Sequence, residues 1–192
     1  MPMPKPKTEG RYLKAPKAGQ SITFRVLADP LEFYVAFKTD EDKKQHPVRR
    51  TSLSDFRPGD YDLTDKFGKA SPKYCQAFPI LGPTRDVMIV EFRQKTILDG
   101  LFALDNKPKW GDLRGYDVTV TGAEDGKSYT VTPEPKEPLT EDEQEKWDGL
   151  VRNGFNLRVL LNCDDPFKEC GVSGGHEDGG PDFDSPDDSI PF

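Results

Sequence analysis

Aromatic side chains beside lysines are the residues of this chain best suited to hold a ligand. Such groups are Trp110 with Lys107 and Lys109, Tyr34 with Lys38, and Tyr74 with Lys73. An aromatic face can stack on a nucleobase, and the neighbouring cation can pair with a phosphate. Four further cations could line the same groove: Arg49, Arg50, Arg93 and Lys95. We expect these eleven residues to form a DNA-binding surface.

Each of these assignments has a plainer alternative. Tyr34 can pack on a second layer, Tyr74 can lie on an inner face with Gln76, and the cations can be ordinary solvated surface. Trp110 is the first choice as a stacking residue, because a Trp in a loop rich in Lys and Gly is less often core. Trp147 stands on a helical apolar stripe and is assigned to the core instead.

Metal and catalytic chemistry find weaker support. Cys163, Cys170 and His176 follow a C-x6-C-x5-H spacing, with Cys75 as a conceivable fourth ligand, and this matches no tight zinc knuckle. No nucleophile elbow, P-loop or dinucleotide fingerprint is present. We therefore expect a protein that is not an enzyme and needs no metal or cofactor, with a metal-dependent nuclease as an alternative because carboxylates are plentiful.

Composition narrows the class of protein further. The chain has 192 residues, of which 34% are hydrophobic and 32% charged, with 17 Gly and 18 Pro. One domain with appended tails fits this length, and so many Gly and Pro residues disfavour a helical bundle. No apolar run reaches the ~20 residues that cross a bilayer, and the first residues lack a signal-peptide core. Three cysteines form no closed disulfide framework, so a cytoplasmic protein without membrane contact is expected.

Charge is segregated along the chain. Residues 1–95 carry 18 basic and 12 acidic side chains, a net charge of +6, and residues 96–163 carry 8 and 13, a net charge of −5. Residues 164–192 hold nine acids and one lysine, a net charge of −8. A basic front and an acidic end favour nucleic-acid binding, an acidic interaction tail, or both. Because residues 1–163 together are net +1, a DNA mimic with an acidic body is disfavoured.

Hydrophobic periodicity predicts mostly strands. Period-2 alternation predicts a bent strand, or two strands around a bulge, over 21–38 and strands over 73–81, 86–93, 116–121, 129–132 and 155–161. A short helix capped by Thr96 is expected to run to Leu104, although Gly100 weakens it. A second helix should begin at a capping box of Thr140 and Glu143 and end near Arg152. The polar segment 39–72 is too long for a hairpin loop and should carry structure or a task of its own.

These elements predict an all-β or β-rich domain. Five strands with a small helix between the third and fourth are compatible with an OB-fold, a partly open five-stranded barrel, followed here by a C-terminal helix and strand. We divide the chain into a basic flexible arm (1–20), the OB-like domain (21–162) and a disordered acidic tail (163–192). The pattern alone supports a β-rich barrel or sandwich without selecting the OB-fold.

The final residues carry a resemblance. Asp187 and Asp188, then Ile190, Pro191 and Phe192, resemble the acidic tip of bacterial and phage single-stranded-DNA-binding (SSB) proteins. Ser189 stands where that family usually has another Asp. The body is larger than a bacterial SSB core and is more similar to the divergent bacteriophage SSB proteins, which join an OB-fold to an acidic tail.

The resemblance implies a function. It implies sequence-independent binding and protection of single-stranded DNA in replication, recombination and repair, in the host cytoplasm if the protein is viral. The five tip residues would recruit a polymerase, helicase, primase or exonuclease, with Phe192 in an apolar pocket and the acids on a basic rim. An RNA-binding chaperone on a β-barrel is a further alternative, because stacking surfaces do not by themselves separate DNA from RNA.

Segregated charge also suggests that the acidic tail competes with DNA for the basic groove. Deleting residues 164–192 should then tighten binding to an oligonucleotide, most strongly at low salt where electrostatic competition is least screened. Fluorescence anisotropy of a labelled oligo-dT across a salt series measures this. An affinity that does not change at low salt would contradict the competition.

Overall fold

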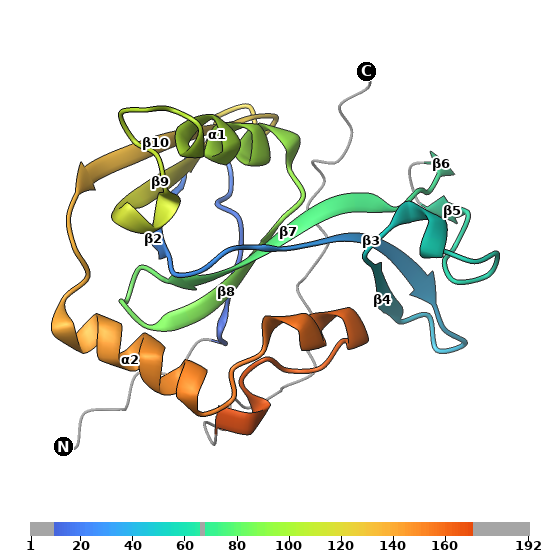
Figure 1. The fold of residues 1–192 in the computed structure, drawn as a ribbon. Helices are drawn as coiled ribbons and strands as arrows, with labels where there is room; N and C mark the ends of the chain where they lie inside the picture. The colour runs from blue at the N-terminus through green and yellow to red at the C-terminus, as the bar shows by residue number, and fades with distance from the viewer. Residues whose placement is uncertain (1–9, 66–67, 171–192) are drawn as a thin grey trace, which may run out of the picture.

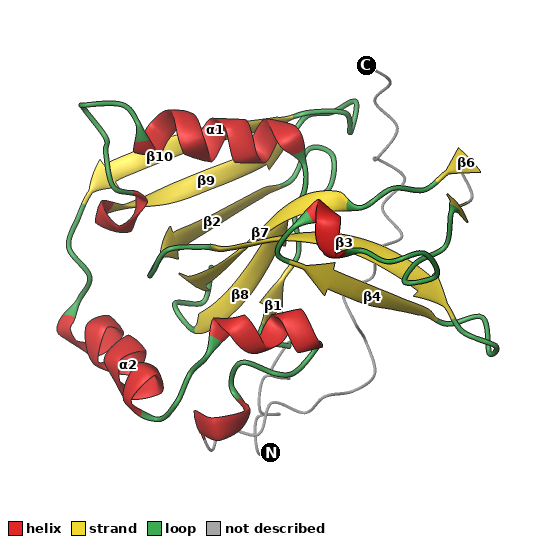
Figure 2. Cartoon of the chain, turned by 45° about the vertical axis from the view of Figure 1, so that its right-hand side comes forward, coloured by secondary structure: helices red, strands yellow, loops and turns green. Residues whose placement is uncertain are grey.

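One mixed β-sheet organises the computed structural model, which describes residues 10–65 and 68–170 (Figures 1 and 2). Its eight strands are β1 (Tyr12–Leu13), β2 (Ser21–Val26), β3 (Leu31–Thr39), β4 (Gln45–Arg50), β7 (Lys73–Leu81), β8 (Val87–Phe92), β9 (Tyr116–Gly122) and β10 (Tyr129–Lys136). They pair in the order β1-β8-β7-β2-β9-β10, and β3 joins β7 to β4. A small separate hairpin joins β5 (Thr64–Asp65) to β6 (Gly68–Lys69). The prediction of a β-rich fold is confirmed, but this sheet is not closed into a barrel.

Helical elements are few among these residues. They are α1 (Lys95–Asp105), α2 (Glu141–Arg152) and the 3-10 turns η1 (Leu53–Asp55), η2 (Leu113–Gly115), η3 (Leu157–Asn162) and η4 (Lys168–Cys170). In the described part of the chain, no helix is long and apolar enough to cross a membrane.

The predicted bent strand over 21–38 is confirmed as two strands that follow the same edge of β7. β2 pairs antiparallel with the last two residues of β7, and β3 pairs antiparallel with its first five. The chain bends between them at 27–30, where Pro30 cannot donate a ladder hydrogen bond. On its other side β2 pairs with β9, so the bend lets one segment serve two parts of the sheet.

Two hydrophobic cores lie on opposite faces of β7 and β8. On one face, called the α1 face, Phe78, Ile80 and Phe92 pack with α1, β2 and β9. On the other, called the α2 face, Ala77 and Leu81 pack with the segment that contains α2 and η3. Figure 1 shows α1 over β9 and β10 and α2 beyond β8. The centre of β7 is therefore buried on both sides, which explains its continuous apolar run.

Helix α1 begins one residue before the predicted cap. Its N-cap is Gln94, which makes no side-chain capping bond, and Thr96 lies inside the first turn, so that prediction was wrong. Ile97, Leu101 and Leu104 are buried, and this apolar stripe positions the helix in the absence of a cap. Gly100 faces β10, where a Cβ atom would lie 2.6 Å from Cγ2 of Val131.

The predicted strand over 155–161 was also wrong. Residues Leu157–Asn162 form the 3-10 helix η3, with Leu160 buried against the α2 face. Period-2 alternation does not by itself distinguish a strand from a short 3-10 helix that buries one side. Here β1 pairs with the edge of β8, and the segment packs on the α2 face, where the Leu160 carbonyl accepts from Arg49 of β4.

The predicted helix over 140–152 is confirmed, together with its capping box. Thr140 Oγ1 accepts from the Glu143 N–H at 3.3 Å, and Glu143 Oε2 accepts from the Thr140 N–H at 2.9 Å. Glu143 also accepts from Arg85 Nε at 2.6 Å, and Arg85 reaches Asp117 at 2.8 Å. Asp117 in turn accepts from the buried Arg25 at 2.6 Å. This charged network fixes the start of α2 to β2 and β9.

Both ends of the described chain pack on the sheet. β1 runs parallel to β8, inside the segment expected to be a flexible arm. Phe167 is fully buried in the α2-face core and Cys170 is buried beside α2, so ordered packing continues into the segment assigned to the tail. A tail deletion that leaves this core intact should therefore start at residue 171.

Close packing at Gly100 predicts an unusual substitution effect. Ala normally stabilises a helix interior by about 1 kcal/mol relative to Gly. Gly100→Ala should instead lower the free energy of unfolding by roughly 1–3 kcal/mol, because the new methyl group overpacks against Val131. Gly149→Ala in α2 is the matched control, since no atom lies within 4 Å of its Cβ position, and it should be stabilising. Urea denaturation of both variants measures this, and a more stable Gly100→Ala would contradict the packing.

The network at α2 predicts acid sensitivity. The hydrogen bond from Arg85, then that from the Thr140 N–H, lowers the pKa of Glu143 from 4.5 to about 2. Its stabilising contribution is therefore complete above about pH 4.5 and is lost as the pH falls towards 2. Glu143→Gln should lower the free energy of unfolding by roughly 2 kcal/mol at pH 7. This difference from wild type should shrink as the pH falls from about 4.5 towards 2. Glu145 is exposed, and Glu145→Gln should change the free energy of unfolding very little, both at pH 7 and in acid. Equal effects of the two variants would refute the role given to Glu143.

Candidate nucleic-acid interface

Two tyrosines share an exposed part of the sheet formed by β4, β3 and β7. Tyr34 on β3 is the register partner of Tyr74 on β7 and of Arg50 on β4. Paired residues point to the same face of a sheet, so these three side chains form a row across three strands. Gln76 of β7 pairs with Phe92, the last residue of β8. The row lies beyond this pair and continues the α1 face past the end of β8. Tyr34 is half-buried, and Tyr74 is 37% exposed.

The two rings are held in a defined arrangement. Their centroids lie 5.5 Å apart with an interplanar angle of 63°, an edge-to-face contact. Gln76 Nε2 donates to the Tyr74 hydroxyl at 2.9 Å and to Glu32 Oε1 at 3.3 Å. Partial burial raises the pKa of Tyr74 above the ordinary value for a phenol. An edge-to-face pair leaves ring surface on which a planar base can stack.

Two of the predicted cations, Lys38 and Arg50, lie on the same face. Each donates a hydrogen bond to the segment that follows β4. Lys38 Nζ donates to the Gly59 carbonyl at 2.6 Å. Arg50 donates to Asp60 Oδ2 at 3.3 Å and to the Arg49 carbonyl at 2.9 Å. The backbone N–H of Asp62 bonds to the Phe37 carbonyl at 2.9 Å and anchors the segment to the end of β3. The long polar insertion therefore has structure of its own, as expected.

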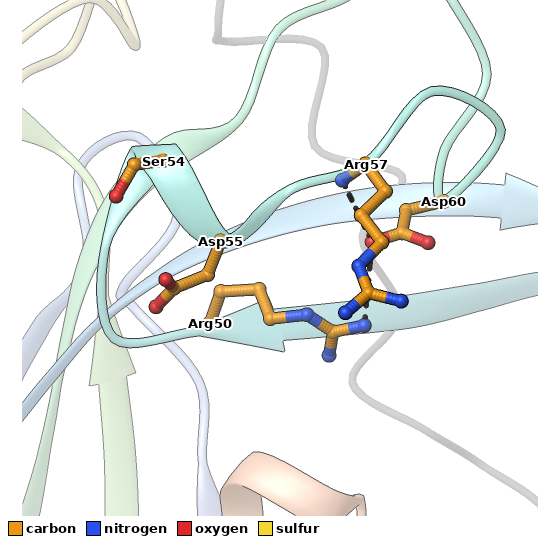
Figure 3. A pocket seen from close by; sticks show the side chains of 5 residues that line it. All are labelled: Arg50, Ser54, Asp55, Arg57 and Asp60. Carbon is orange, nitrogen blue, oxygen red and sulfur yellow. Dashed lines mark hydrogen bonds and ion pairs between the residues drawn. The ribbon is translucent and has the colours of Figure 1, made fainter.

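A hollow of about 590 Å³ lies between β4 and the part of the insertion that follows it, residues 51–62 (Figure 3). It is lined by Arg50, Ser54, Asp55, Arg57 and Asp60. The backbone N–H of Arg57 bonds to Asp60 at 3.0 Å, which lowers the pKa of that carboxyl group. Arg57, Ser54 and Gln76 were not among the predicted site residues. Arg57 directly follows Phe56, so a cation beside an aromatic residue was an available signal, whereas Ser54 and Gln76 adjoin no aromatic residue.

Three predicted residues lie away from this surface. Arg49 is buried on the α2 face, where its guanidinium donates to both oxygens of Glu91 at 3.0 and 3.2 Å. Strand alternation separates it from Arg50, so its role here is in the core. Lys73 pairs with Val35 and also belongs to the α2 face. Arg93 follows β8, with its guanidinium 5.9 Å from the centre of the Phe37 ring.

The remaining candidates lie at α1 and the loop that follows it. Lys95 is exposed and pairs with Asp99 at 2.5 Å. Lys107 and Lys109 are exposed, and Lys109 Nζ lies 5.1 Å from the centre of the Trp110 ring. Trp110 is half-buried, packs 5.4 Å from the Tyr116 ring and joins the α1-face core. The structure thus brings together Tyr34, Tyr74, Arg50 and Lys38, and separates them from Trp110, which the sequence ranked first.

Other predicted sites lie partly or wholly outside the described residues. These are the five tip residues Asp187, Asp188, Ile190, Pro191 and Phe192, and the possible metal ligand His176. Cys75 and Cys170 are buried free thiols, whereas Cys163 is exposed. Among residues 10–65 and 68–170, no three His, Cys, Asp or Glu side chains gather closely enough to hold a metal ion.

Comparison with protein-family models, with curated proteins and with solved structures finds no match to this chain. Its function must therefore be argued from the site itself.

Proposed function

We propose that this protein binds single-stranded DNA without sequence preference and protects it during replication, recombination and repair. The observation that carries the proposal is the row of Tyr74, Tyr34 and Arg50 across the exposed part of the sheet. Stacking on aromatic side chains contributes ~1–3 kcal/mol per base and tolerates any base, because every base has a π face. Arg50 and Lys38 supply positive charge beside the rings for the phosphates.

The order of strands supports an OB-type origin for the sheet. If β2 and β3 are counted as one bent strand and the edge strands β1 and β4 are set aside, five strands remain in the order β8-β7-β2-β9-β10, with α1 between the third and fourth along the chain. A closed barrel of this order would pair β8 with β10. We propose an OB-type barrel opened at that seam, where β1 lines the edge of β8.

The α2 face is a poor surface for DNA. OB-folds use the face of their second and third strands, which here would be β7 and β8. On the α2 face these strands carry Ala77, Leu81 and Ile89, all buried beneath α2 and η3. A binding surface for a polyanion needs exposed cations and rings, and these occur on the extension of the α1 face.

Recruitment of partner enzymes is the second part of the proposal. It rests on the resemblance of the last residues to the tips of SSB proteins, of which the phage proteins are the nearest in size and layout. Ile190, Pro191 and Phe192 would enter an apolar pocket of a replication or recombination enzyme, and Asp187 and Asp188 would meet its basic rim. Such a role places the protein in the cytoplasm, or in the host cytoplasm if it is viral.

The tyrosine row predicts the effect of removing each ring. Tyr74→Ala and Tyr34→Ala should each weaken binding to a labelled oligo-dT about 5- to 150-fold, the equivalent of one lost stacking contact. Tyr74→Phe should retain most of the affinity, because it keeps the ring. Phe102→Ala is the control: this ring is 71% exposed on α1, outside the row, and its loss should not change binding.

Fluorescence anisotropy with competitors provides the measurement. Unlabelled single strands should compete, duplex should not, and affinity should fall with salt. No binding of the wild-type protein at low salt, also after deletion of residues 171–192, would refute the proposal. Stronger competition by oligo-U than by oligo-dT would favour an RNA chaperone, and shortening of the oligonucleotide with Mg²⁺ but not EDTA would favour a nuclease.

A further inference from the structure

We propose that the hollow between the insertion and β4 is a phosphate subsite, in which Arg50 and Arg57 bind the sugar-phosphate backbone of a single strand. The inference rests on the proposed function and adds to it the path of the strand. Bases would stack on Tyr34 and Tyr74, and an adjacent phosphate would lie in the hollow.

The position of Arg50 connects the hollow to the stacking surface. Arg50 is the register partner of Tyr34, and neighbouring strands lie about 4.8 Å apart. Its guanidinium lines the hollow together with that of Arg57, which reaches it from the insertion (Figure 3). A strand lying across β7 and β3 would therefore meet two rings and then two guanidinium groups.

Asp55 and Asp60 offset the charge of the two arginines in the hollow, so a phosphate must compete with these carboxylates for the guanidinium groups. Asp60 is occupied by the backbone N–H of Arg57 and by Arg50, and Asp55 accepts from the Thr51 hydroxyl at 3.3 Å. Among the described residues, the Arg57 guanidinium has no hydrogen-bond or ion-pair partner. Arg57 is exposed as well, so its five N–H donors are available to an anion.

The Arg50–Asp60 pair can rearrange at low cost. Its atoms lie 3.3 Å apart, and the two side chains are 38% and 23% exposed. Ion pairs of this kind contribute about 0–1 kcal/mol. A phosphate offers guanidinium groups a bidentate, charge-assisted contact that is stronger than this pair.

The decisive measurement is the salt dependence of binding. Each phosphate contact adds about 0.7 to the slope of log K against log salt for single strands. Arg57→Gln should lower this slope by about 0.7, which weakens binding roughly eightfold at 50 mM salt and hardly at all near 1 M. The loss should be equal for oligo-dT and oligo-dC. Arg57→Lys keeps the charge and should keep the slope.

Lys146→Gln is the matched control. Lys146 is an exposed cation on α2, 4.0 Å from Asp86, and its loss should leave the slope unchanged. Since Arg57 is exposed, its substitution should not unfold the protein, and equal urea midpoints for wild type and Arg57→Gln would verify this.

The possible failures are distinct. If wild type binds oligo-dT and Tyr74→Ala weakens it, but Arg57→Gln leaves slope and affinity unchanged, the subsite is refuted and the proposed function stands. Arg57→Gln could instead leave the salt slope constant and change the relative affinity for guanine-containing and thymine-containing strands. In that case the hollow contacts base edges, and the phosphate subsite is refuted. If wild type binds no single strand, both proposals fail.

Discussion

The burial of β7 on both faces is the constraint on which the rest of the fold depends. Ala77, Phe78, Ile80 and Leu81 alternate between two cores, and each core needs its own cover. Helix α1 with β9 covers one, and the segment containing α2 and η3 covers the other. On the α2 face η3 also covers β3 and β4, where Arg49 donates to the Leu160 carbonyl. On the α1 face the first residues of β7, with β3 and β4, extend past α1 and β9, and the exposed tyrosine row lies there.

Charge has two different tasks in this molecule. Arg25 and Arg49 are almost fully buried, and each is matched by a carboxylate, Asp117 or Glu91, since an unpaired buried charge would cost several kcal/mol. These pairs tie distant elements together. Arg50 and Arg57 are solvated and weakly held, which suits groups that exchange partners when a ligand arrives. The composition of the sequence does not distinguish these four arginines, although Arg50 and Arg57 face solvent and Arg25 and Arg49 do not.

Periodicity in the sequence predicts most of the sheet. The alternation in β3 and β9 and the capping box at Thr140 are local signals, and the structure confirms them. The wrong strand prediction depended on packing that periodicity does not encode: Leu157 and Leu161 alternate like strand residues, yet they belong to the 3-10 helix η3 on the α2 face. Trp110 stays a predicted stacking residue, although its ring is half-buried and packs 5.4 Å from that of Tyr116. Tyr34 and Tyr74 were both candidates, but only strand pairing brings them together.

The contacts that complete the α2 face and the adjoining edge of β8 join residues that are far apart along the chain. Arg49 bonds to the Leu160 carbonyl across 111 positions of sequence, and β1 pairs with residues 89 and 90. Contacts of such long range form slowly, because the loops between them must close first. During synthesis the apolar side of β7 and β8 stays uncovered until residues near 167 leave the ribosome. The nascent chain therefore exposes an apolar sheet surface while residues 93–167 are synthesised, and exposed apolar surface of this kind is prone to aggregation.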